Sequence, residues 1–128
     1  MLDTNAVVLL GSLDPALLPA EPVITAITLA ELSAGPLSTD DPAERAARQI
    51  RLQEVEASFD PLPFDAAAAR AFGLVAAQLS SAGRRVRPRA FDALIAATAM
   101  ANELPLYTCN ARDFVGISGL QVVDVPHP

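Results

Sequence analysis

The chain has 128 residues, 52% of them hydrophobic, and 15 acidic residues against 9 basic ones give it a formal net charge of −6. This length fits one domain with its own core, so we expect residues 1–128 to form a single domain, and the acidic balance argues against a protein that coats nucleic acid. The single cysteine, Cys109, excludes an internal disulfide. The apolar runs are too short for a membrane span, and no basic region precedes Ala6–Leu10 as it would in a signal peptide. We therefore expect a cytoplasmic protein.

The chain alternates short apolar segments, which predict strands, with longer amphipathic segments, which predict helices. In chain order, the predicted elements are a minimal strand at Met1–Asp3, a short helix over Val7–Leu10, a proline-rich loop over Asp14–Pro22, a strand at Val23–Ala26, a helix over Leu29–Ala34, a helix from Pro42 to near Phe59, a strand at Leu62–Phe64, a helix over Ala66–Ala82, a helix from Pro88 to Asn102, and strands at Leu106–Thr108 and Gln121–Val125. Because strands and helices alternate, the sequence predicts an α/β fold, a three-layer α/β/α sandwich around a mostly parallel sheet.

Local signals predict where the helices begin and end, and a periodic pattern predicts which faces are buried. Asp41 is the expected N-cap of the helix that starts at Pro42, and Asp65 is the expected N-cap of the next helix. Gly83 is expected to end that second helix. The residues expected to face inward are Ala46, Ile50, Leu52 (one position off the face) and Val55 in the first of these helices, Phe72, Val75, Ala76 and Leu79 in the second, and Phe91, Leu94, Ile95 and Thr98 in the helix from Pro88.

Four acidic residues fall at one predicted edge of the sheet. Asp3 ends the first strand, Glu31 lies in the helix after the second, Asp92 lies near the start of a helix, and Asp113 follows the fourth strand. In an open parallel sheet, functional groups collect at the carboxyl ends of the strands. Four carboxylates repel one another unless a cation lies among them, and hard divalent cations prefer oxygen ligands. The sequence therefore predicts a site for one or two Mg²⁺ or Mn²⁺ ions.

Three of these acids also have a purely structural interpretation. Asp3 can cap the following helix, and Asp92 can complement the dipole of its own helix. Asp113 can stabilise its turn or pair with Arg112, and pairing with a nearby acid is the interpretation we favour for that arginine. Glu31 lies among apolar residues, where an ionised side chain needs a reason to be present, although a surface-facing stripe is the alternative.

The four acids lie in sequence segments that resemble a known family. These segments are Leu2-Asp3-Thr4-Asn5, Thr28-Leu29-Ala30-Glu31-Leu32, Asp92-Ala93-Leu94-Ile95-Ala96-Ala97-Thr98-Ala99 and Thr108-Cys109-Asn110-Ala111-Arg112-Asp113-Phe114. In this order and at this spacing they resemble the PIN-domain family, in particular the VapC-like ribonuclease toxins of bacterial toxin–antitoxin modules. Asp3 follows only two residues, whereas family members often carry a few more before this segment, so we expect either a very short first strand or a start codon that lies upstream of Met1.

The resemblance implies a PIN-like fold, a metal-dependent endoribonuclease and a set of site residues. The residues that match the family's acidic quartet are Asp3, Glu31, Asp92 and Asp113, which would bind Mg²⁺ or Mn²⁺. Asp3 and Asp92 would be direct ligands, and Glu31 and Asp113 would bind a second ion or hold waters of the first. The residues that match polar positions, which orient those carboxylates or contact phosphate, are Thr4, Asn5, Thr108 and Asn110. The resemblance also implies an RNA substrate, a cognate antitoxin that covers the acidic pocket, and a homodimer.

Several other residues have more than one interpretation. The basic cluster before Asp92 consists of Arg84, Arg85, Arg87 and Arg89, which either contact RNA phosphates or form a solvated loop. Cys109 is expected to be a small core residue rather than a nucleophile, and His127 receives no role. The apolar face of Ile50, Val55 and Phe59 belongs either to the core or to a surface that grips an antitoxin helix.

Two other functions use the same residues. A catalytically silent PIN-fold binding module would keep the fold without binding metal, and the presence of all four acids argues against it. A DNA-directed nuclease or a phosphatase would use the same metal site, and only a comparison of substrates separates it from a ribonuclease.

Overall fold

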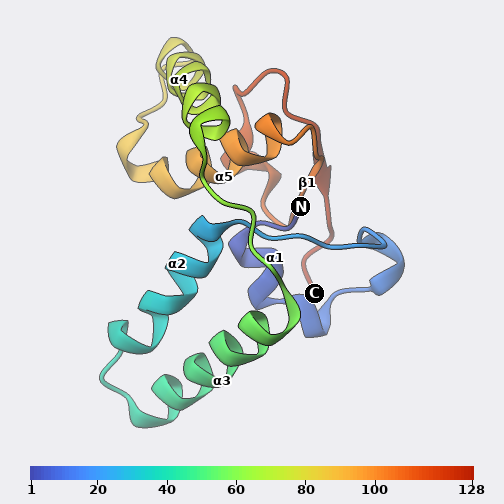
Figure 1. Ribbon diagram of the computed structural model, residues 1–128, viewed down its shortest axis with the longest axis vertical. Coiled ribbons are helices and arrows are strands. Elements are labelled where there is room, and N and C mark those ends of the chain that lie inside the picture. Colours follow the sequence, from blue (N-terminus) through green and yellow to red (C-terminus); the bar gives the residue numbers. More distant parts are fainter.

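The computed structural model describes residues 1–128, and Figure 1 shows how its elements are arranged. The α-helices are α1 (Thr4–Val8), α2 (Ala26–Ala34), α3 (Pro42–Ser58), α4 (Ala66–Ser81) and α5 (Ala90–Ala101), and the strands are β1 (Leu106–Thr108) and β2 (Val122–Asp124). Helices α4 and α5 lie together beside the strands, whereas α2 and α3 form a separate pair, with α1 between the two groups (Figure 1). None of the helices has the length and apolar character that crossing a membrane requires.

The sheet is small and parallel, and it extends beyond its two regular strands. β1 pairs with β2 in parallel, with Leu106 opposite Val122. Single parallel bridges join Leu2 to Tyr107 and Thr25 to Leu62, and the Leu2 amide donates to the Val23 carbonyl at 2.9 Å. The order across the sheet is therefore the Leu62 segment, the Val23–Thr25 segment, the Leu2 segment, β1 and β2.

This order confirms the predicted parallel α/β arrangement and shows where a site is expected. All five predicted strands take part in the pairing, although three of them do so only through isolated bridges. The Leu2 segment lies between the Val23–Thr25 segment and β1. The next two strands along the chain therefore lie on one side of the Leu2 segment and the last two on the other, so the strand order reverses between Leu2 and Tyr107. Such a switch point is where the carboxyl ends of parallel strands form a crevice. Here those ends carry Asp3 and Thr108.

The predicted helix caps are confirmed. The Asp41 carboxylate accepts from the Ala43 amide at the start of α3, and the Asp65 carboxylate accepts from the Ala68 amide at the start of α4. Both caps satisfy amides that have no partner within their own helix. Gly83 follows α4 with a φ of 74°, a left-handed conformation that favours glycine. The chain leaves α4 there and enters the arginine cluster.

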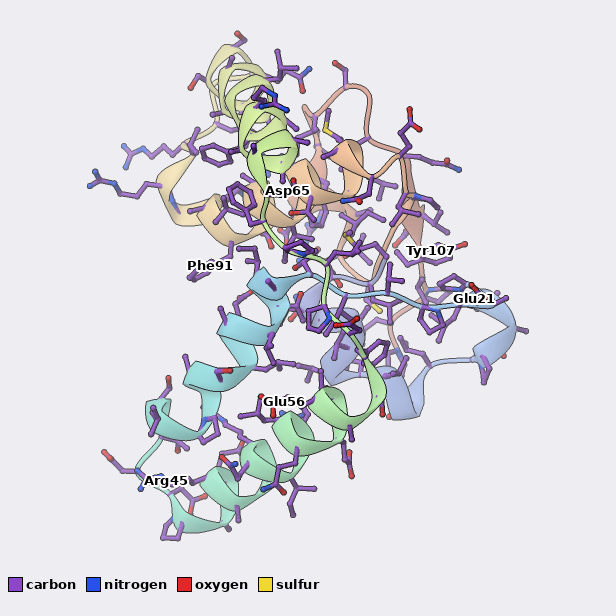
Figure 2. All side chains as sticks on the ribbon, in the orientation of Figure 1. Glu21, Arg45, Glu56, Asp65, Phe91 and Tyr107 are labelled. Atoms are coloured by element: carbon purple, nitrogen blue, oxygen red, sulfur yellow. The ribbon has the colours of Figure 1, made fainter.

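The hydrophobic core divides into two clusters, and three residues expected inside lie outside. One cluster is centred on α4 and α5, and the other lies between α1, α2 and α3. Ile50 is 56% exposed, Phe91 is 55% exposed and Ala46 is also exposed, so their expected inward positions are wrong. The buried side of α3 is formed instead by Val55 with the partly buried Leu52, because only one side of this helix packs against the protein. Phe91 lies in the first turn of α5, at the edge of the molecule (Figure 2).

Candidate metal centre

Asp3 ends the first extended segment and begins α1. One of its carboxylate oxygens accepts from the Ala6 amide at 2.9 Å, and the other accepts from the Thr108 hydroxyl at 2.5 Å. The Thr108 hydroxyl oxygen in turn accepts from the Asn110 amide at 3.0 Å. Asp3 is only 3% exposed. Burial raises its pKa, the two hydrogen bonds oppose that rise, and the negative charge of Asp113 adds to it.

Asp3 therefore does what its structural interpretation proposed, because it caps α1. The cap uses one carboxylate oxygen, and the bond from Thr108 fixes the direction of the other. Both donors are neutral, so the negative charge of this buried carboxylate has no basic partner. The structural role and a role in cation binding are compatible, because each carboxylate oxygen has a second lone pair.

Glu31 lies on α2, and its carboxylate accepts a hydrogen bond from Thr4 of α1, which Thr28 contacts in turn. The Thr4 hydroxyl donates to the Glu31 carboxylate at 2.6 Å, and it also lies 3.0 Å from the Thr28 hydroxyl. Thr4 is thus placed to orient a carboxylate, as the sequence predicted for this polar position. Thr28, one helical turn before Glu31, was missed as a site residue, because a threonine inside a helix carries no distinctive signal in the sequence.

Asp92 lies in the first turn of α5, as predicted. The pKa of Asp92 is raised from 3.8 to about 6. Burial is the largest cause, and the charges of Asp113, Glu31 and Asp3 add to it, while the charge of Arg89 opposes them. All three other acids of the predicted quartet therefore act electrostatically on Asp92. The fold has brought the four carboxylates into one neighbourhood.

Asp113 lies in the short 3₁₀ turn after β1 and has a basic partner. Its two oxygens accept from the Asn110 side-chain amide at 2.8 Å and from the Arg89 guanidinium at 2.9 Å. The Arg89 pair is a salt bridge in which both side chains are partly exposed. Arg112, which we expected to pair with a nearby acid, forms no salt bridge, so that expectation is wrong. Arg112 and Asp113 are neighbours on a tight turn, whereas Arg89 reaches Asp113 from the start of α5.

The arginine cluster divides into two kinds of residue. The Arg84 guanidinium donates to the carbonyls of Arg112 and Val115, on either side of Asp113. Arg84 thus fixes the turn that carries Asp113, and Arg89 binds the carboxylate itself. Arg85 and Arg87 are exposed and form no ion pair. Neither interpretation from the sequence described the whole cluster.

The remaining predicted site residue, Asn5, lies in α1, two residues after Asp3. It is exposed and lines a hollow with Cys109, Asn110, Arg112 and His127, without a side-chain hydrogen bond to any of the four acids. A role in contacting phosphate stays a prediction. Cys109 is half-buried beside β1, and burial raises the pKa of its thiol, with the charges of Asp3 and Asp124 adding to the rise. A thiol with a raised pKa is a poor nucleophile.

The donors at this centre fit a hard divalent cation. The side chains are carboxylates, and three of them, Asp3, Glu31 and Asp92, have no basic partner in a salt bridge. No group of three or more His, Cys, Asp or Glu side chains is arranged to hold an ion directly. An ion that uses one or two carboxylates and keeps several waters is the usual arrangement for Mg²⁺. The four-ligand set that the sequence predicted stays a prediction.

The fold and the centre together define a parallel α/β domain with an acidic site at its switch point. The chain belongs to the PIN-domain family, because the model of the PIN domain matches residues 1–119. The predicted family and the predicted fold class are thus confirmed.

Relatives from bacteria cover nearly the whole chain. Ribonuclease VapC5 of Mycobacterium tuberculosis is 37% identical, over 98% of this chain and 92% of that protein. The tRNA(fMet)-specific endonuclease VapC of Shigella flexneri is 33% identical, over 97% and 96% of the two chains. Among solved structures, the toxin–antitoxin complex VapBC-5 of Mycobacterium tuberculosis matches with a TM-score of 0.82 at 34% identity, over 97% of this chain and 96% of that chain.

Proposed function

We propose that this chain is a divalent-metal-dependent endoribonuclease and the toxin of a toxin–antitoxin module in the cytoplasm. Its relatives are named ribonucleases and endonucleases, which supports nuclease activity. The observation that carries the metal requirement is Asp92, whose pKa is raised to about 6 by burial and by the three other carboxylates. A carboxylate cluster of this kind is unfavourable by itself, and a divalent cation removes the repulsion.

The chain's own residues would hold the cation and keep the site ordered. Asp3 and Asp92 are the proposed direct ligands, and Glu31 would hold waters of the ion. Thr108 fixes the Asp3 carboxylate and Thr4 fixes that of Glu31, so neither has to be ordered when an ion binds. When bound, such an ion supplies a Lewis acid for a phosphodiester and makes a water a better nucleophile at neutral pH.

RNA is the proposed substrate, and the exposed arginines favour a phosphate backbone near the site. Arg85 and Arg87 carry their charge at the surface, in the segment that leads to Asp92. Arginine binds phosphate well because its guanidinium donates in a fork. The experiment is cleavage of single-stranded RNA, and of DNA of the same sequence, with Mg²⁺ or Mn²⁺. RNA cleavage that stops with EDTA supports the proposal.

The variants are chosen so that they separate the site from the rest of the surface. Asp92→Asn removes one proposed ligand and should lower the cleavage rate by at least about a hundredfold. Glu56→Gln is the matched control, because Glu56 is an exposed carboxylate on α3 (Figure 2). Cleavage that persists in Asp92→Asn or in EDTA would overturn the metal requirement. Cleavage of DNA alone would favour the DNA-directed nuclease, and metal binding without any cleavage would favour the silent binding module.

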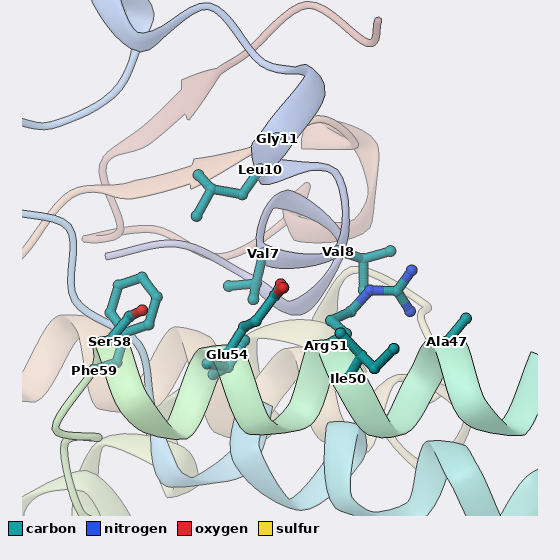
Figure 3. Close-up of a pocket in the computed structure, with 11 residues that line it drawn as sticks. Val7, Val8, Leu10, Gly11, Ala47, Ile50, Arg51, Glu54, Ser58 and Phe59 are labelled. Atoms are coloured by element: carbon teal, nitrogen blue, oxygen red, sulfur yellow. The ribbon is translucent and has the colours of Figure 1, made fainter.

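An antitoxin is the proposed protein partner, and a groove between α1 and α3 is its proposed docking surface. The similar solved structure VapBC-5 belongs to a family of toxin–antitoxin systems. The groove has a volume of about 400 Å³ and is lined mainly by apolar side chains (Figure 3). Val8 and Ile50 are exposed there, whereas Val55 and Phe59 also pack in the core, so the core interpretation of this face holds for those two residues and Ile50 is left open to a partner. An amphipathic segment would cover such a groove.

Co-expression tests the partner and the surface. The chain carrying Ile50→Asp should lose binding to a co-expressed cognate antitoxin, whereas Gln49→Asp, on the same helix but outside the groove, should retain it. Retained binding in Ile50→Asp would place the antitoxin elsewhere. Light scattering of the isolated chain tests the proposed homodimer, which would have about twice the mass of 13.4 kDa.

A further inference from the structure

Arg89 differs from every other base near the acidic centre because it is the one in a salt bridge with a member of the quartet. Its guanidinium lies 2.9 Å from Asp113, whose second oxygen is taken by Asn110 at 2.8 Å. Both oxygens of Asp113 are therefore engaged within the chain. Arg89 also lies at the start of α5, three residues before Asp92, and its charge acts on that carboxylate as well.

Both partners of this salt bridge are held by backbone contacts. The Arg89 amide donates to the Val86 carbonyl at 3.0 Å, which fixes the start of α5. The Asp113 amide donates to the Asn110 carbonyl at 3.0 Å, and Arg84 binds carbonyls on both sides of Asp113. A pair whose two backbones are fixed loses less entropy on forming than a pair between two free side chains. The Arg89–Asp113 pair is a built part of the centre.

The charges of the centre are therefore distributed unevenly. Asp113 is paired with the Arg89 guanidinium, whereas Asp3, Glu31 and Asp92 accept hydrogen bonds only from neutral donors or from none. A divalent ion that approaches Asp113 meets the positive guanidinium at short range, and this repulsion is strong where solvent screening is weak. Around Asp92, the charges of the three other carboxylates outweigh the opposing charge of Arg89, and Asp3 has no basic partner. The carboxylates that lack a basic partner in a salt bridge therefore lie on the side of Asp3 and Asp92, and a cation is expected there.

We propose that Arg89 is a positioning residue that takes the place of a second metal ion, so that the centre binds one divalent ion, on the side of Asp3 and Asp92. Asp113 then acts through its salt bridge with Arg89 and is not a metal ligand. This inference rests on the proposed metal-dependent function and adds the number of ions to it.

The test counts Mn²⁺ ions bound per chain, by calorimetric titration and by the electron paramagnetic resonance signal of free Mn²⁺. The wild-type chain should bind one ion. Arg89→Gln should bind two, or bind the second at least about tenfold more tightly than the wild type, because the guanidinium no longer repels it. Arg89→Lys keeps the charge and should still bind one. Arg85→Gln, which removes an exposed and unpaired arginine of the same segment, is the matched control and should match the wild type.

A double variant tests Asp113 without leaving a charge unpaired. Arg89→Gln with Asp113→Asn replaces the salt bridge by a neutral pair of similar shape, and it also serves if Arg89→Gln alone does not fold. The first ion should bind within about threefold of the wild-type affinity, whereas loss of a ligand or its support would cost about 10–100-fold. Two equally tight ions in the wild type, or a loss of more than about tenfold in the double variant, would overturn the inference. RNA cleavage by a wild-type chain with two ions bound would overturn the one-ion inference and leave the proposed function standing. A wild-type chain that binds no Mn²⁺ would overturn both.

Discussion

The two ends of the acidic centre use opposite means to hold a carboxylate. Asp3 is buried and held by the Ala6 amide and the Thr108 hydroxyl, which are both neutral. Asp113 is partly exposed and held by a guanidinium and an amide. Asp3 therefore keeps a buried negative charge without a basic partner, whereas the charge of Asp113 is compensated by the Arg89 guanidinium. The carboxylate without a basic partner is therefore at the Asp3 end, where we propose that the cation binds, whereas Asp113 already has Arg89 as a cationic partner.

Thr108→Val removes the hydroxyl that holds Asp3 and should have the largest effect on stability. The buried carboxylate loses a donor that no water replaces, which should cost about 2–3 kcal/mol of the free energy of unfolding. Thr98→Val is the matched control, because Thr98 is equally buried but its hydroxyl donates to a backbone carbonyl of its own helix. That variant should cost less than about 1 kcal/mol. Urea denaturation measures both, and equal losses would contradict a special role for Thr108.

Asp92→Asn should stabilise the metal-free protein at neutral pH. Because the pKa of Asp92 is about 6 in the folded chain and 3.8 ordinarily, the folded state binds the proton more tightly than the unfolded state. Asp92 therefore lowers the stability of the metal-free wild type as pH rises from about 4 through about 6. The variant lacks this loss and should be more stable by about 1–2 kcal/mol at pH 8, after allowance for solvent screening and for the helix dipole.

The pH profile distinguishes this effect from a general one. Denaturation of the metal-free wild type and of Asp92→Asn should differ at pH 8 and converge towards pH 4, while the part of the profile that comes from Asp3 remains in both. Asp60→Asn removes an exposed carboxylate outside the centre and should leave the profile unchanged. A constant difference between wild type and Asp92→Asn at every pH would contradict the assignment.

Arg84→Gln should have a smaller effect, at the Asp113 end. Arg84 donates to the carbonyls of Arg112 and Val115, and both remain near solvent when it is removed, so the loss should be about 1 kcal/mol. Arg85→Gln lacks comparable bonds and should change stability by less than about 0.5 kcal/mol. Hydrogen exchange of the Asp113 amide should accelerate only in Arg84→Gln, and acceleration in both variants would contradict the division of the arginine cluster.

The sequence predicted those parts of the fold that depend on neighbours along the chain. Asp41 and Asp65 cap their helices as expected, because capping needs only an acceptor and the amides of the next turn. The short strands were also found, since each is an apolar segment between turns. Ile50 and Phe91 were placed wrongly, because helical periodicity gives a face but not the extent to which other elements cover it.

The same limit applies to the centre. The resemblance to a family supplied the four acids, and the pKa of Asp92 shows that they share one neighbourhood. The partners of those acids lie far along the chain: Thr108 is 105 residues from Asp3, and Arg89 is 24 residues from Asp113. A pairing of this kind depends on the packing of α5 against the turn after β1. The sequence therefore suggested Arg112, which is adjacent, in place of Arg89.

The most direct test of the central claim is the effect of Mn²⁺ on thermal unfolding, because a ligand that binds only the folded state raises the Tm. The wild type should gain about 5–10 °C at an ion concentration about 100 times the Kd. Asp92→Asn should gain little, although it starts from a higher Tm without metal. An equal gain in both chains, or none in the wild type, would contradict a metal centre built on the unneutralised carboxylates.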